Sequence, residues 1–175
     1  GALFGALNQR PAALVSFLNG RATVTPKPLH CRNAGAALAH MHLAGADFSM
    51  QRENTQALQN WRQLFEACQT RADEVTPGLA SLIDAELSRL EAHWPSDLPR
   101  GIIHADLFPD NVFFEKGEVS GLIDFYFACN DNLAYDLAIM LNAWCFEADV
   151  SFNITKARAL LAGYQSVRPM SSAEI

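Results

Sequence analysis

The chain has 175 residues, half of them hydrophobic, and its 13 basic and 19 acidic side chains give a formal net charge of −6. This length suffices for one core or for one lobe of a larger protein. The acidic balance without a basic run argues against nucleic acid or an anionic membrane surface as partner. No apolar run is long enough to span a membrane, no signal peptide is recognisable, and the four cysteines lie far apart. We therefore expect a cytoplasmic protein with buried thiols.

The first predicted elements are a strand and a helix. The strand covers residues 12–18, after the turn signal Gln9-Arg10-Pro11 and before an Asn-Gly pair. The helix covers residues 29–43, where apolar residues recur at helical spacing. His40 and His42 lie on opposite sides of this helix, so we expect surface or core histidines rather than a metal-binding pair.

Two more helices are predicted before residue 100. One lies within residues 54–70, where aromatic and aliphatic side chains recur at helical spacing and favour a core face. The next begins at Thr76-Pro77, with the threonine as cap and the proline in the first helical position, and continues to Trp94. We expect these helices to pack around a small hairpin sheet.

The central motif has the form His-x-Asp-x-x-x-x-Asn, in which the specified residues are His104, Asp106 and Asn111. A short strand is predicted before the motif, and a hairpin over residues 112–123 is predicted after it. The return strand of the hairpin brings Asp124 next to Asn111. The sequence therefore predicts two carboxylates and one carboxamide around a tight loop.

These residue types suit the transfer of a phosphoryl group from ATP to a hydroxyl. A carboxylate has to accept the proton of the acceptor, and hard oxygen ligands have to hold Mg²⁺ on the phosphates. By the spacing of kinase catalytic loops, Asp106 is the expected base, and Asn111 and Asp124 are the expected metal ligands. The alternative is that all three are ordinary loop residues. For His104 we expect a structural bond to the loop backbone rather than a role as base.

The rest of the chain predicts two helices, over residues 133–146 and 155–164. Asp131 or Asn132 is expected to cap the first of them. Asp136 lies in its first turn, where a carboxylate interacts favourably with the helix dipole.

The motif and its flanks resemble a known family. Residues 103–111 and 122–125 carry the signature of the aminoglycoside phosphotransferase and choline kinase branch of the protein-kinase-like fold. Within that branch, residues 10–20, 124–131 and 135–147 are most similar to the type II homoserine kinases. The resemblance implies an α+β, protein-kinase-like fold. The chain would hold mostly the α-helical C-lobe with a small catalytic β-hairpin, with the N-lobe largely missing.

The resemblance also implies a division of the chain and further roles. Residues 1–20 are the expected end of the N-lobe with its hinge strand, and residues 21–175 are the expected helical C-lobe, incomplete at both ends. The family's glycine-rich loop and phosphate-binding lysine are expected upstream of the chain. The backbone near Ser16, Phe17 and Leu18 is expected to meet the adenine of ATP. Asp136 is expected to bond the backbone of the catalytic loop.

By the same resemblance, the protein is expected to use ATP and Mg²⁺ to phosphorylate L-homoserine, a step towards threonine. Candidate contacts to this zwitterion are Asp131, Trp144, Glu147 and Arg32. Cationic groups are scarce, because no lysine or arginine lies between Lys116 and Lys156. Choline and an aminoglycoside are alternative substrates on the same fold, since aromatic residues can cage a quaternary ammonium and carboxylates can face a polycation. A truncated kinase-like binding module is the alternative from a different class, and the oligomeric state stays open.

Overall fold

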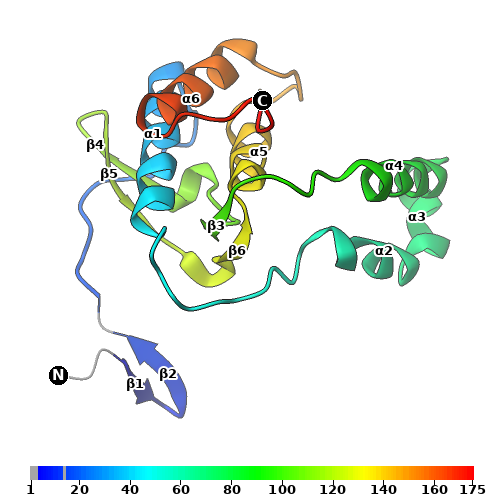
Figure 1. Cartoon of the computed structure of the whole chain (residues 1–175), viewed down its shortest axis with the longest axis horizontal. Coiled ribbons are helices and arrows are strands. Elements are labelled where there is room, and N and C mark those ends of the chain that lie inside the picture. The colour runs from blue at the N-terminus through cyan, green and yellow to red at the C-terminus, as the bar shows by residue number, and fades with distance from the viewer. Residues whose placement is uncertain (1–3, 14) are drawn as a thin grey trace.

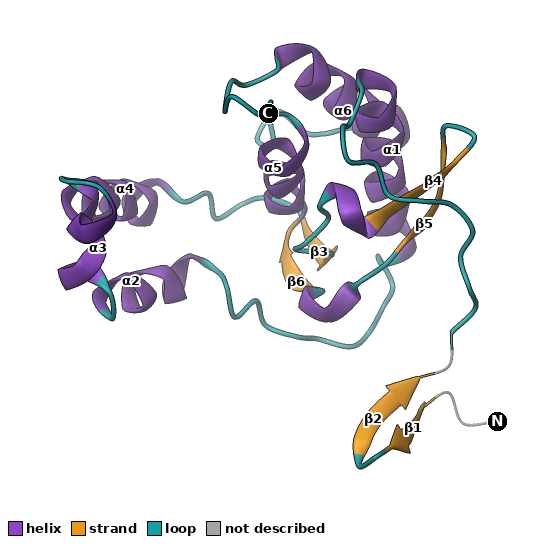
Figure 2. Ribbon diagram, turned by 180° about the vertical axis from the view of Figure 1, so that it is seen from behind, coloured by secondary structure: helices purple, strands orange, loops and turns teal. Residues whose placement is uncertain are grey.

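The structure is a computed structural model that describes residues 4–13 and 15–175. Figures 1 and 2 show three parts: a body, an arm at one side of it, and a small hairpin at the N-terminal end. The body comprises α1 (Pro28–Ala44), β3 (Arg100–Ile103), β4 (Val112–Glu115), β5 (Glu118–Leu122), β6 (Cys129–Asn132), α5 (Leu133–Trp144) and α6 (Ile154–Val167). The arm comprises α2 (Leu58–Glu66), α3 (Gln69–Val75) and α4 (Leu79–His93), and the N-terminal hairpin comprises β1 (Phe4–Leu7) and β2 (Arg10–Ala13).

The core of the body lies between α1, α5 and α6. Its fully buried side chains include Leu38 of α1, Met140 of α5 and Leu160 of α6. The backbones of α1 and α6 approach closely where each helix carries a glycine. A Cβ atom on Gly163 would lie 1.9 Å from the Arg32 carbonyl oxygen, so only glycine fits there.

Two short antiparallel ladders bring the ends of the central motif together. β3 pairs with β6, and β4 pairs with β5 through a turn at Lys116 (φ +53°) and Gly117 (φ +91°). Positive φ at both central residues is typical of the type I′ turn, a common two-residue hairpin connection. The predicted hairpin over residues 112–123 is therefore confirmed, and the helices with small antiparallel sheets agree with the predicted α+β class.

The predicted strand over residues 12–18 is correct only for its first two residues. Ala12 and Ala13 belong to β2, Leu14 lies outside the described residues, and residues 15–18 have no regular structure. Val15 is 82% exposed and Phe17 is 91% exposed. A strand needs a partner along at least one edge, and among the described residues β1 pairs only with residues 10–13.

The predicted helix within residues 54–70 is shorter than expected and is followed by α3. Before α2, residues 52–54 are bonded to β6: the Arg52 carbonyl accepts from the Asn130 N–H at 2.8 Å, and the Asn54 amide donates to Asp131 at 2.7 Å. The predicted cap at Thr76 is also wrong. The preceding helix continues to Val75, and α4 begins at Leu79, after Gly78 with φ +85°.

The later helices agree with the prediction to within a few residues. Asn132 occupies the position before α5, but its side chain makes no cap bond there. Three cysteines are buried as expected, whereas Cys68 is exposed, so the prediction of four buried thiols is wrong for this one. Within residues 4–13 and 15–175, no helix combines the length and apolar character that crossing a membrane requires.

Candidate active site

The catalytic loop begins with a strained residue. Ala105 has φ +62°, a left-handed conformation that costs a non-glycine residue about 1–2 kcal/mol. The buried carboxylate of Asp136 holds the loop in this conformation, because Oδ2 accepts the His104 N–H at 2.7 Å and Oδ1 accepts the Ala105 N–H at 3.0 Å. The first turn of α5 thus fixes the backbone immediately before Asp106.

Asp136 is held in turn by a buried network that reaches the last helix. His42 of α1 lies 3.0 Å from Asp136 Oδ2 through Nε2 and 2.8 Å from the Tyr164 hydroxyl through Nδ1. Arg168 donates to the same hydroxyl at 3.1 Å. Burial raises the pKa of Tyr164, so this hydroxyl is neutral at physiological pH. The network connects three helices to the catalytic loop.

Asp106 and Asn111 lie at the two ends of the same tight loop. The Asn111 Nδ2 group donates to the Asp106 carbonyl at 2.7 Å and lies 3.3 Å from Asp106 Oδ2. Asn111 is buried, whereas Asp106 is partly exposed. The carboxamide therefore orients the carboxylate and leaves it accessible.

Asp124 lies next to Asn111 because the hairpin returns there. The Ile123 N–H donates to the Asn111 carbonyl at 3.0 Å, and Asp124 follows with φ +65° and an exposed side chain. His104 supports this junction, since its Nε2 is 2.9 Å from the Ile123 carbonyl. His104 is fully buried and is therefore placed as a structural residue.

The oxygen atoms of Asp124 and Asn111 suit a hard cation. The Asp124 carboxylate makes no hydrogen bond to the described residues, and Asn111 uses its Nδ2 group for Asp106, which leaves Oδ1 for a ligand. Carboxylate and carboxamide oxygens are ligands that Mg²⁺ accepts. The described residues contain no group of three or more His, Cys, Asp or Glu side chains placed for a metal.

A cavity of about 320 Å³, called the acceptor cavity below, opens beside Asp106. Its walls come from the segment before α2, from the catalytic loop, from residues 127–129 and from α5. The lining residues are Arg52, Glu53, Asn54, Thr55, Gln56, Ala105, Asp106, Phe108, Phe127, Cys129, Tyr135 and Ile139.

The charges on the acceptor cavity are few. Burial raises the pKa of the Cys129 thiol and of the Tyr135 hydroxyl, so both groups are neutral at physiological pH. The charged residues that remain are Arg52, Glu53 and Asp106. One cation and two carboxylates therefore line a cavity of small-molecule size.

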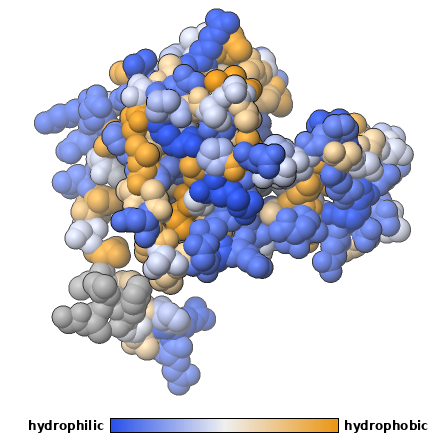
Figure 3. Space-filling model, viewed as in Figure 1, coloured by the Kyte–Doolittle hydropathy of each residue, from blue (hydrophilic) through white to orange (hydrophobic). Residues whose placement is uncertain are grey.

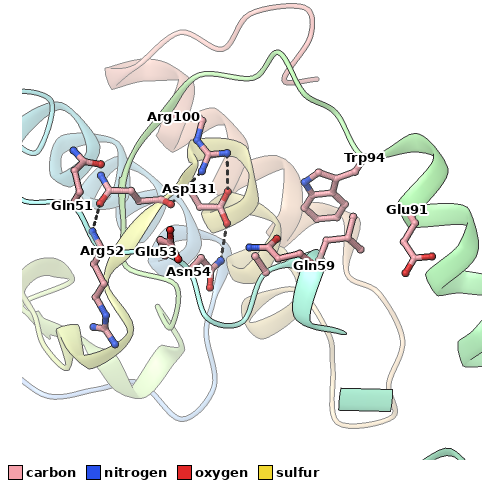
Figure 4. A pocket seen from close by; sticks show the side chains of 12 residues that line it. Gln51, Arg52, Glu53, Asn54, Gln59, Glu91, Trp94, Arg100 and Asp131 are labelled. Atoms are coloured by element: carbon pink, nitrogen blue, oxygen red, sulfur yellow. Dashed lines mark hydrogen bonds and ion pairs between the residues drawn. The ribbon is translucent and has the colours of Figure 1, made fainter. Parts of the chain in front are cut away.

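Asp131, a predicted substrate contact, lies in a neighbouring cavity of about 610 Å³. Figure 4 shows it between Arg100 and Asn54, at 3.6 Å from an Arg100 nitrogen and 2.7 Å from the Asn54 amide nitrogen. Only 6% of Asp131 is exposed. Its carboxylate is occupied by these internal partners.

The other predicted substrate contacts lie away from the acceptor cavity. Trp144 is 1% exposed, and its Nε1 donates to the Leu107 carbonyl at 2.8 Å, so it supports the loop from the core. Glu147 pairs with the Lys156 ammonium at 2.8 Å, which lowers the pKa of Glu147. Arg32 lies on α1, with its carbonyl against Gly163 of α6.

The segment predicted to meet adenine runs along the hairpin of the motif. Ser16 and Phe17 are exposed, and the Leu18 side chain packs over Gly121 of β5. Immediately after it, Ser120 donates to the Asn19 carbonyl at 2.6 Å. These contacts place the segment beside the β4–β5 hairpin, while its role stays a prediction.

Two residues of the site were missed in the sequence. His42 had been assigned only to the surface or the core, although a buried histidine needs polar partners, and Asp136 was available as one. Arg52 gave no signal, because its place beside Asp106 depends on contacts between residues far apart in the chain.

Comparison with known proteins agrees with this arrangement. A family model described as phosphotransferase enzyme family matches residues 2–170. Homoserine kinases of Chelativorans sp. and Rhizobium rhizogenes are both 61% identical, over 99% and 100% of this chain and 54% of their own length. The chain thus spans about half the length of the curated relatives it matches.

Solved structures show the same fold at lower identity. An aminoglycoside-3'-phosphotransferase of type VIII is 24% identical with a TM-score of 0.67, over 90% of this chain and 63% of that one. An amicoumacin kinase in complex with AMP-PNP, Ca²⁺ and Ami is 17% identical with a TM-score of 0.69, over 99% of this chain and 55% of that one. With its catalytic loop, its hairpin and a family match over nearly all of its length, the chain belongs to the phosphotransferase enzyme family.

Proposed function

We propose that the full-length protein is an ATP-dependent kinase that phosphorylates the hydroxyl of L-homoserine, a cytoplasmic step towards threonine. The observation that carries the proposal is the position of the Asp106 carboxylate, which is oriented by Asn111 on the wall of a small cavity. The identity of 61% to curated homoserine kinases over nearly the whole chain supports the choice of substrate.

In this proposal Asp106 accepts the proton of the substrate hydroxyl. General-base assistance of this kind contributes about 10²–10⁴-fold to the rate. Asp136 acts indirectly, because its two bonds to backbone N–H groups keep the loop in the conformation that presents Asp106.

Asn111 and Asp124 hold Mg²⁺ in this proposal, and Ser16, Phe17 and Leu18 contact the adenine of ATP. When bound, the metal ion neutralises charge on the phosphate oxygens. The amicoumacin kinase of the same fold, whose structure includes AMP-PNP and Ca²⁺, supports the use of a nucleotide with a divalent ion. The Asn111 Oδ1 atom and the Asp124 carboxylate, which make no hydrogen bond to the described residues, suit this role as metal ligands.

The geometry favours L-homoserine over the two alternatives. The expected choline cage consists of Tyr126, Phe127, Trp144 and Phe146, and of these four only Phe127 lines the acceptor cavity. Trp144 is in the core, and Phe146 packs edge-to-face on Phe152 at 5.2 Å.

The carboxylates expected to face an aminoglycoside are not free, because Asp131 and Glu147 already have cationic partners and Asp149 accepts hydrogen bonds from Ser151. The acceptor cavity instead carries both signs of charge, which suits a small zwitterion.

A coupled ADP-release assay on the full-length protein tests the proposal. L-homoserine, choline and kanamycin are supplied in parallel at equal concentrations with Mg·ATP. We expect turnover of L-homoserine to exceed that of the other two by at least about 100-fold, because neither competitor matches the charges of the acceptor cavity. Faster turnover of choline or kanamycin would overturn the choice of substrate.

A further inference from the structure

The substrate of the proposed reaction carries a carboxylate, and the structure offers a cation for it that lies far from the catalytic motif in sequence. Arg52 belongs to the linker segment, residues 45–57, which connects α1 to α2. Figure 1 shows this segment passing below β6 on its way to the arm. Arg52 lines the acceptor cavity together with Asp106.

Both backbone polar groups of Arg52 are hydrogen-bonded to Asn130 of β6. Its N–H donates to the Asn130 side-chain oxygen at 2.8 Å, and its carbonyl accepts from the Asn130 N–H, also at 2.8 Å. A residue anchored through both backbone groups loses little further freedom when its side chain binds a ligand, which favours affinity.

The guanidinium is fixed as well. Its Nη1 donates to the Tyr126 carbonyl and, at 3.2 Å, to the Ala128 carbonyl. Figure 4 shows this side chain directed away from Asp131 and Arg100. The edge formed by Nε and Nη2 makes no hydrogen bond to the described residues. Two parallel N–H donors in a fixed plane match a carboxylate bidentately.

The charge of Arg52 is not already used by the protein. Five other arginines have a carboxylate partner within 4.0 Å, namely Arg62, Arg71, Arg89, Arg100 and Arg168. No carboxylate of the described residues lies within that distance of Arg52, although the chain is acidic. Its nearest hydrogen-bond partners are neutral carbonyl groups, which orient the cation without neutralising it.

From these observations we infer that Arg52 binds the carboxylate of the hydroxy amino acid whose hydroxyl faces Asp106. The inference rests on the proposed function and goes beyond it by assigning the recognition of the carboxylate to one residue. Arg52 thereby determines specificity, because an amino alcohol has no carboxylate for the Nε and Nη2 groups to bind. Arg32, the cation expected from the sequence, has no part in this binding.

The inference is tested with two substrates and three variants of the full-length protein. Arg52→Gln removes the cation, Arg52→Lys keeps the charge without the planar fork, and Arg32→Gln is the matched control. L-homoserinamide is the second substrate, because it keeps the size and hydroxyl of L-homoserine but has no carboxylate. The steady-state KM and kcat for each substrate, the KM for ATP and the melting temperature are measured.

We expect Arg52→Gln to raise the KM for L-homoserine by about 30-fold or more, since hydrogen bonds to charged groups are among the strong ones. Its effect on L-homoserinamide should stay within about threefold, because the interacting group is absent from that substrate. Arg52→Lys should lie between Arg52→Gln and the wild type. Arg32→Gln should behave as the wild type with both substrates.

Each contrary result has a distinct meaning. An equal loss with both substrates would show that Arg52 only supports the fold, and an unchanged KM for L-homoserine would remove it from the site. A large effect of Arg32→Gln would transfer the role to Arg32. If the wild type phosphorylates another hydroxyl compound but not L-homoserine, the proposed function fails, and the assignment of Arg52 fails with it.

Discussion

The body and the arm differ in the size of their cores and in whether the core contacts the catalytic loop. The body encloses a continuous core from α1, α5 and α6, and its buried Trp144 donates directly to the backbone of the catalytic loop. The buried core of the arm consists of Phe65, Ala72 and Leu87. Figure 3 shows apolar side chains gathered over the body, whereas the visible face of the arm is mostly hydrophilic.

The junction between the two parts is aromatic. Trp61 of α2 and Trp94 after α4 lie 6.3 Å and 5.9 Å from the ring of Tyr135 in α5, measured between centroids. Tyr135 also lines the acceptor cavity. The body thus carries the candidate catalytic residues, while the arm is joined to it beside the acceptor cavity. Changes in the body should therefore alter activity, and changes in the core of the arm should leave it intact.

The largest effect on activity outside the base should come from Asp124→Ala in the body. Loss of a charged metal ligand should raise the Mg²⁺ concentration required for half-maximal activity by about tenfold or more. Titration of Mg²⁺ at fixed ATP measures this in the full-length protein. Asp84→Ala on the arm is the control, since its carboxylate pairs only with Arg62 among the described residues. An unchanged Mg²⁺ requirement for Asp124→Ala would make Asp124 a structural residue.

Asp136→Ala should have the next largest effect, and it should appear in both stability and rate. The change leaves the N–H groups of His104 and Ala105 without their acceptor and His42 without its carboxylate. Each buried donor that loses its hydrogen-bond acceptor costs about 1–3 kcal/mol of the free energy of unfolding. Urea denaturation measures the loss, and His40→Ala, an exposed change on α1, is the control. A loss below about 1 kcal/mol would contradict the role given to Asp136.

Truncating one buried leucine in each core should show that the body and the arm differ in stability. Leu160→Ala in the body should lower the free energy of unfolding by about 2–5 kcal/mol, because the side chain is fully buried. Leu87→Ala in the arm should cost less and should raise amide hydrogen exchange mainly in α2–α4, because a small core opens locally. Hydrogen exchange of both variants tests the comparison. Exchange that rises equally throughout the chain in Leu87→Ala would show that body and arm unfold as one unit.

The parts of the site that the sequence predicted correctly are those set by short-range geometry. Only four residues lie between Asp106 and Asn111, and a tight hairpin returns the chain to Asp124, so local turn chemistry brings these groups together. The same holds for α1, α5 and α6, whose apolar spacing is regular.

The missed parts depend on contacts between distant segments. Arg52 reaches the acceptor cavity because residues 52–54 are bonded to β6. The residue pattern of 54–70 does not predict this contact with a strand far away in the sequence. The strand predicted over residues 12–18 has suitable residues, but among the described residues no strand pairs with 15–18. The Thr76-Pro77 pair is typical of a helix start, but Gly78 adopts a positive φ, so α4 begins only at Leu79.

The central claim is that the body presents Asp106 as the base for the acceptor hydroxyl, and Asp106→Asn in the full-length protein tests it most directly. Asparagine keeps the size of the side chain but cannot accept the proton. Steady-state kinetics with saturating L-homoserine should show kcat reduced by about 10²–10⁴-fold with a nearly unchanged KM for ATP. A variant that retains more than about a tenth of the wild-type kcat would remove Asp106 from this role and contradict the account.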